Sequence, residues 1–211
     1  MRRHTRRGPF TGQASPLLVA NLVPAARQEH AQLHVLCGPG QHRPLGELIR
    51  AAELTQRGSP RFAAETARWA GQPGQARRDG VPVAACPRQP DGLEFATRGF
   101  TRDPRHGFTV RAFDGSPHAL GVVALLSTRD DSRLSWLYAG QALQRPLLQA
   151  TADGIAAAFH TQPLELPGTR EQIRAQFTDG RYPQMLLRLG CGGRKLTAPR
   201  RPVSDTLRTT P

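Results

Sequence analysis

The feature that most constrains the fold is the apolar run ALGVVALLST at 119–128. Its length suits one strand, and it lacks the polar alternation of a strand with one face in water. Such a strand must be covered on both faces, so we expect it at the centre of a sheet. Two further strand patterns, QLHVLC at 32–37 and PQMLLRLG with its core at 184–189, are expected beside 119–127.

Helical patterns separate these strands. SPLLVANLVPAARQE predicts a helix with Ser15 as its N-cap and Pro16 at its first position. The longest pattern, 131–157, carries apolar residues around most of its circumference and predicts a buried core helix, with a kink at Pro146. Shorter helices are expected at 43–57, 59–71 and 167–177. The sequence therefore predicts an α+β fold with a mixed sheet packed around the 131–157 helix.

The length of 211 residues suits one domain, and we expect a single domain over 1–211. The run 71–117 is rich in Gly, Pro and Arg and has no sustained period, which predicts a mobile excursion or lid. Residues 192–211 have little core content and are expected to form an extended tail.

The net charge of +13 favours polyanionic partners only weakly. Lys195 is the only lysine, and abundant Arg, Ala, Gly and Pro are typical of a GC-rich coding sequence. Three widely spaced cysteines indicate neither a disulfide framework nor a metal site, and fit the reducing cytoplasm. No apolar stretch has the length of a membrane span or of a signal-peptide core.

Three polar patches are candidates for binding. Arg3-His4-Thr5-Arg6-Arg7 offers guanidinium and hydroxyl donors suited to phosphate, or is a solvated basic end. Pro199-Arg200-Arg201-Pro202 offers a rigid second pair of arginines. Thr161-Gln162-Pro163-Leu164-Glu165-Leu166-Pro167 lies between two predicted helices and is a linker if it has no role in binding. No catalytic dyad, nucleophile motif or metal-ligand spacing was found.

In this order, the three patches resemble the flavin-binding landmarks of the FMN-dependent nitroreductase family. MRRHTRRGPFTGQ, STRDDSRLSWLYAGQALQRPLLQATADG, TQPLELP, PQMLLRLG and APRRPV together are most similar to actinobacterial Acg-type nitroreductase-like proteins. The resemblance implies a nitroreductase-like fold and an oxidoreductase that uses FMN, with NAD(P)H as co-substrate. By a ping-pong hydride transfer, nitroaromatics or quinones would be reduced.

The resemblance also implies roles for single residues. Arg3, His4, Thr5 and Arg7 would hold the FMN phosphate and ribityl chain, and Arg200 and Arg201 would close on the same phosphate. Pro163, Leu164 and Glu165 would lie along the isoalloxazine edge. No side chain is expected to act as acid or base, because the family's chemistry is carried by the flavin.

Two departures from the family leave alternatives open. Leu166-Pro167 stands where many members have Gly, and no P-S-x-x-N-x-Q-P-W segment is found. The chain resembles the second copy of the tandem Acg-type fold, so we expect a truncated half, a homodimer, or pairing with a separate N-terminal half. A non-catalytic remnant that binds flavin or only a partner chain is the main alternative. Nucleic-acid binding rests on charge alone.

Overall fold

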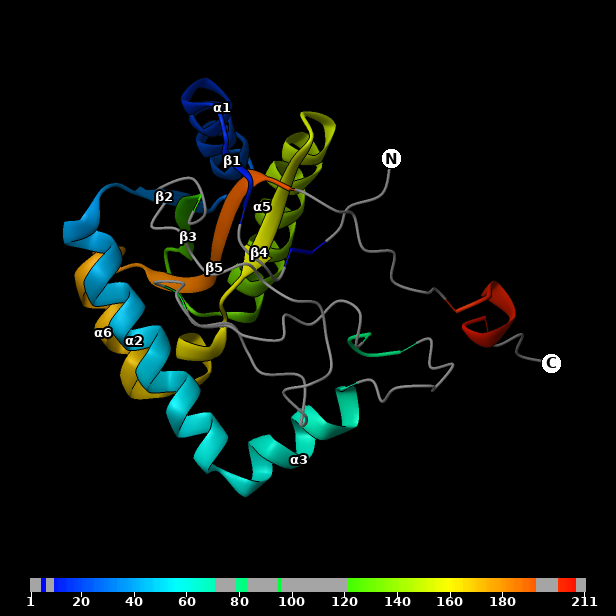
Figure 1. Cartoon of the computed structure of the whole chain (residues 1–211). Coiled ribbons are helices and arrows are strands. Elements are labelled where there is room, and N and C mark those ends of the chain that lie inside the picture. Colours follow the sequence, from blue (N-terminus) through cyan, green and yellow to red (C-terminus); the bar gives the residue numbers. More distant parts are fainter. Residues whose placement is uncertain are drawn as a thin grey trace.

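The structure is a computed structural model that describes residues 5–6, 10–70, 79–82, 95, 121–192 and 201–207. Its sheet has the strand order β1-β5-β3-β2, with β4 on the other side of β5 (Figure 1). The strands are β1 (Gly12–Gln13), β2 (Gln32–Leu36), β3 (Val122–Thr128), β4 (Ile155–Phe159) and β5 (Tyr182–Cys191). β3 pairs with both β2 and β5, so the apolar run does form an interior strand of the sheet, as predicted.

All pairings between these named strands are antiparallel. A parallel bridge between Thr5 and Ala157 adds the parallel element at the outer edge of β4. The described strands therefore form an antiparallel sheet, and the mixed character that was expected is limited to this isolated bridge. The predicted α+β architecture is confirmed.

Helices cover both faces of the sheet (Figure 1). Side chains alternate along β3, so that Ala124 and Leu126 face one core cluster and Val123 and Leu125 face another. The first cluster is formed with α1 (Pro16–Arg27) and α5 (Arg133–Ala152). The second is formed with α2 (Pro39–Gly58) and α6 (Pro167–Phe177). This double coverage explains why β3 has apolar residues at five successive positions, from Val122 to Leu126.

The helix predicted over 131–157 is shorter in the structure, and this expectation was wrong at its C-terminal end. α5 stops at Ala152, a turn follows with Gly154 at φ 75°, and Ile155–Phe159 forms β4. The sequence IAAAF is rich in alanine, a good helix former, and it continues the apolar pattern of the helix. Pairing with β5 along the full length of β4 outweighs that local preference.

α5 is also less buried than expected. Ala139, Ala142 and Leu147 on one side are packed into the core, whereas Leu134 and Leu137 are 56% and 68% exposed. The physical reason is that the sheet and α1 together cover only one side of the helix. Pro146 does lie within α5, on its buried side.

The start of α5 is anchored by Asp131. The guanidinium of Arg170, on α6, donates two hydrogen bonds to its carboxylate at 2.7 and 2.8 Å. Gln184 on β5 donates a third at 3.0 Å. The hydrogen bonds from Arg170, and to a smaller extent the one from Gln184, hold the pKa of Asp131 well below its usual range. The network therefore ties α5, α6 and β5 together at neutral pH.

Most of the predicted excursion at 71–117 lies outside the described residues, so its mobility stays a prediction. Val81 forms a bridge with Ala70, which follows α3 (Pro60–Trp69), and Phe95 is fully buried in the second core cluster. The predicted tail contains a 3-10 turn, η3 (Val203–Asp205), in its described part.

Candidate functional site

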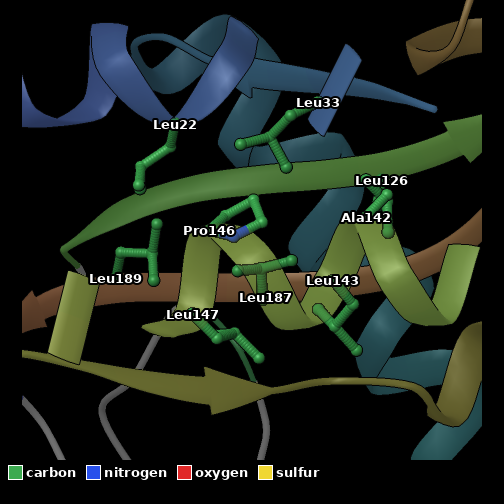
Figure 2. A pocket seen from close by; sticks show the side chains of 9 residues that line it. All are labelled: Leu22, Leu33, Leu126, Ala142, Leu143, Pro146, Leu147, Leu187 and Leu189. Atoms are coloured by element: carbon green, nitrogen blue, oxygen red, sulfur yellow. The ribbon is translucent and has the colours of Figure 1, made fainter. Parts of the chain in front are cut away.

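The one cavity described for this part of the chain is not a ligand site. Figure 2 shows the nine apolar side chains that line it, with Pro146 of α5 among them. Its volume is about 10 Å³, which is at the lower limit for a single water molecule. With no polar group to orient a ligand, it is a packing gap in the first core cluster. The polar residues that sequence reasoning singled out lie elsewhere.

Part of the predicted phosphate-binding run lies along the outer edge of β4. Thr5 is bridged to Ala157 of β4, and the backbone N–H of Arg6 donates to the Ala157 carbonyl at 2.7 Å. Thr5 is exposed and Arg6 is half-buried, and burial lowers the pKa of the Arg6 guanidinium. Arg3, His4 and Arg7 lie outside the described residues. Thr5 and Arg6 therefore add one short parallel contact to the edge of β4.

The second predicted patch forms a 3-10 turn at the end of the same strand. β4 leads through His160 and Thr161 into η2 (Gln162–Glu165), which contains Pro163, Leu164 and Glu165. Gln162 and Pro163 are buried, whereas Glu165 is exposed. Pro167 then begins α6 and Leu166 is its N-cap, with extended backbone angles. The structure thus brings Thr5 and η2 to the same strand, one beside its middle and the other after its end.

The third predicted patch is described only at Arg201, because Arg200 lies outside the described residues. Arg201 forms a bidentate ion pair with Asp79, with Nε–Oδ1 and Nη2–Oδ2 distances of 2.5 and 2.6 Å. Hydrogen bonding to Asp79 raises the pKa of Arg201. This pair links the tail to residues 79–82, and it uses two of the three guanidinium nitrogens.

A fully buried arginine is a feature that the sequence reasoning missed. Arg188 on β5 donates from Nε to Nε2 of the buried His160 at 2.8 Å. Burial, with a smaller effect of Arg6, lowers the pKa of Arg188 to about 10, so it is still charged at neutral pH. Arg188 is paired with Ala158 of β4, one residue after Ala157. Arg6 and Arg188 therefore lie on one face of the sheet, opposite α5.

The chain that follows the N-terminal run is fixed by Phe10. This buried ring fits over two glycines, and a Cβ built at Gly190 would be only 2.6 Å from the Phe10 Cγ. A Cβ at Gly121 would be 2.7 Å from Cδ2 of the same ring. The Arg188 guanidinium lies 5.3 Å from the ring centroid, a distance typical of a cation–π contact. Glycine is needed at both positions for Phe10 to dock.

A second missed feature is a group of buried polar side chains on α2. Glu53 and Gln56 are each 5% exposed, and they contact η2. A signal for them was present, since Leu45, Ile49 and Ala52 mark the buried stripe of α2 and positions 53 and 56 continue it. Polar residues on a buried helical stripe indicate specific partners in the fold.

Chemically, the described site offers backbone and hydroxyl groups with a nearby arginine at the β4 edge, and a carboxylate on η2. Among the described residues, no group of three His, Cys, Asp or Glu side chains could hold a metal ion. Likewise, none of the helices in the described part of the chain is both long and apolar enough for a membrane span. The arrangement suits an elongated ligand with an anionic end more than bond cleavage by protein side chains.

Comparison with known sequences gives two kinds of relative. The Mycobacterium tuberculosis protein named "Putative NAD(P)H nitroreductase Rv3131" is 49% identical over 70 residues, which is 33% of this chain and 20% of that protein. "Uncharacterized protein Rv3127" of the same species is 28% identical over the full chain. The chain spans 62% of the length of that second protein. No protein-family model matches the chain.

Comparison with solved structures covers nearly the whole chain. An FMN- and NADPH-dependent nitroreductase, NfnB from Sphingopyxis, has a TM-score of 0.58 at 17% identity and covers 99% of this chain and 96% of its own. A nitroreductase with bound FMN from Bacteroides fragilis has a TM-score of 0.56 at 11% identity and covers 99% and 95%. These likenesses show a nitroreductase-like fold. Together with the mycobacterial relatives, they confirm the predicted resemblance to nitroreductases of the Acg type.

Proposed function

We propose that this chain binds FMN and acts as an NAD(P)H-dependent oxidoreductase of nitroreductase type. The observation that carries the proposal is the meeting of two predicted flavin patches at β4, with Thr5 beside Ala157 and η2 beginning five residues later. Five extended residues span at most about 17 Å, a separation that one FMN can bridge with its phosphate at one end and its ring at the other. The fold and the mycobacterial relatives support the same assignment.

The residues present fit such a group. The exposed Thr5 on a basic segment suits the phosphate and ribityl chain, and the half-buried Arg6 adds positive charge nearby. Arg3, His4, Arg7, Arg200 and Arg201 are proposed as further phosphate ligands. Pro163, Leu164 and Glu165 would lie along the ring. When bound, FMN supplies hydride transfer between NAD(P)H and a nitroaromatic or quinone acceptor, and the protein supplies binding and orientation.

A fluorescence titration with FMN tests the assignment. We expect saturable quenching with the wild type, and at least about a tenfold loss of affinity in Arg3→Ala and in Arg201→Ala, because charge-assisted bonds to phosphate are each worth about 1.5–3 kcal/mol. Asp79→Ala separates two roles of Arg201: it strengthens binding if the ion pair competes with phosphate, and weakens it if the pair orients the guanidinium. Arg27→Ala, at the exposed end of α1, is the matched control. No saturable quenching with the wild type would contradict the proposal.

We also propose that the partner is a second copy of this chain, docked on α5. The exposed side of that helix carries Leu134, Leu137, Gln141, Gln144 and Leu148. Their spacing of three and four residues forms one continuous stripe, as in paired helices. α5 contains no Asp or Glu, so two copies would meet without buried carboxylates. We call this stripe the α5 interface.

Sedimentation tests this interface. We expect the wild type to be a dimer at micromolar concentration, and Leu137→Glu to be a monomer, because the new carboxylates would be buried against an apolar partner. Leu54→Glu is the control, since Leu54 is 64% exposed on α2 and lies outside the stripe. A Leu137→Glu dimer of unchanged stability would place the contact elsewhere.

A non-catalytic flavin-binding domain remains the second candidate, and Pro167 favours it. As the first residue of α6 it fixes Leu166 in an extended conformation where many nitroreductases have Gly. FMN binding with no NAD(P)H oxidation above that of free flavin would support this alternative. A cytoplasmic location is proposed from the cysteine content.

A further inference from the structure

We propose that Gln56 of α2 is a positioning residue, which sets the place of η2 and of the Glu165 carboxylate. This inference rests on the proposed function, because η2 is the segment assigned to the flavin ring. The side-chain amide of Gln56 donates two hydrogen bonds from Nε2. One goes to the backbone carbonyl of Gln162 at 3.2 Å, and the other goes to Oε2 of Glu165 at 2.9 Å.

The chemistry of these partners fixes the orientation of the amide. A carbonyl and a carboxylate can only accept, so both contacts require the NH₂ group of Gln56 to face η2. The two bonds start from one atom and reach the first and the last residue of the four-residue turn. Gln56 therefore fixes the turn at both ends. It also sets the separation between Gln162 and Glu165.

Three further contacts make the attachment rigid. Glu53, one helical turn earlier, accepts from the side-chain amide of Gln162 at 3.4 Å. Thr161 donates to the second carboxylate oxygen of Glu165 at 3.5 Å. Leu164 packs against the second core cluster, to which the α2 residues Leu45 and Ile49 belong. Since α2 is a 20-residue helix with a buried stripe, it is a firm support for a short turn.

The consequence concerns the Glu165 carboxylate. Glu165 is exposed, and an exposed glutamate without such contacts would sample several rotamers. Here Gln56 donates to one oxygen at 2.9 Å and Thr161 lies 3.5 Å from the other, so the orientations open to the carboxylate are restricted. A ring bound along η2 would meet a fixed negative charge, whose position depends on α2.

The test compares Gln56→Leu with the wild type, using Thr55→Val as the control on the neighbouring exposed position of α2. Leucine fills similar space but removes both donors. The first readout is amide hydrogen exchange in the flavin-free chain at Leu164, whose N–H donates to the Thr161 carbonyl within the turn. We expect exchange to rise at least about tenfold in Gln56→Leu and to stay unchanged in Thr55→Val.

The second readout uses the FMN-loaded chain. We expect Gln56→Leu to change the FMN affinity less than about threefold, to alter the visible absorption band of the flavin, and to slow flavin reduction by NAD(P)H about tenfold. Gln56→Glu should be slower still at pH 8, since its carboxylate would repel that of Glu165.

The outcomes are distinct. Unchanged exchange at Leu164 in Gln56→Leu overturns the inference, whatever the flavin does. Raised exchange in a chain whose wild type binds no FMN supports the attachment of the turn and overturns the proposed function alone. Raised exchange with an unchanged flavin spectrum and reduction rate shows that η2 does not meet the ring, and overturns the positioning role.

Discussion

Replacing His160 with leucine is expected to lower the free energy of unfolding by about 3 kcal/mol. Arg188 is fully buried and its Nε donates to His160 Nε2 at 2.8 Å. An arginine can only donate, so His160 must be neutral with its proton on Nδ1. His160→Leu removes this acceptor from a fully buried guanidinium, and hydrogen bonds to charged groups are among the most costly to lose. Urea denaturation at pH 7 measures the change.

A double variant separates the charge from the packing. His160→Leu combined with Arg188→Met removes both partners and keeps the buried volume similar, so we expect it to be more stable than His160→Leu alone. The ring centroids of Phe95 and His160 are 5.8 Å apart, and a leucine at position 160 would retain part of that contact. If the single variant is as stable as the double variant, the hydrogen bond to His160 contributes little.

The secondary structure follows from sequence where the local pattern and the tertiary packing agree. β3 is recognisable because a strand covered on both faces needs apolar residues at successive positions, and six of its seven residues, Val123–Thr128, are buried. β4 is not recognisable, because Ile155–Phe159 is short, rich in alanine and preceded by a long helix. The one signal in the sequence that the helix ends was Gly154. Glycine is common in turns, and here it adopts a φ of 75° directly after Asp153.

In the candidate site, too, the residues in local sequence patterns could be predicted, and the pairs that are distant in sequence could not. Thr5 and Pro163 were found because they stand in local patterns that can be compared with a family. Arg188 and His160 are 28 positions apart, and Gln56 and Glu165 are 109 apart, and no single-sequence pattern joins them. Such pairs depend on which strands and helices become neighbours. An arginine within an apolar strand, and a glutamine on a buried helical stripe, show only that some partner exists.

Substituting Gly190 with alanine is expected to cost about 2 kcal/mol of stability and to weaken FMN binding about tenfold. The new Cβ would lie 2.6 Å from the Phe10 Cγ and 2.9 Å from its Cβ, distances that side chains do not tolerate. The Phe10 ring must therefore leave its place over Gly121 and Gly190. Phe10 follows the segment that carries Thr5, so this displacement should reach the β4 edge.

A double-mutant cycle shows whether Phe10 causes the effect. In a Phe10→Ala background the ring is absent, so Gly190→Ala should cost at least about 1 kcal/mol less than in the wild type. Gly140→Ala is the matched control, because a Cβ there meets no atom within 4 Å in the described structure and alanine favours a helix. If Gly190→Ala costs the same in both backgrounds, the strain comes from the β5 backbone. If it destabilises the chain but leaves FMN affinity intact, Phe10 does not hold the phosphate-binding segment in place.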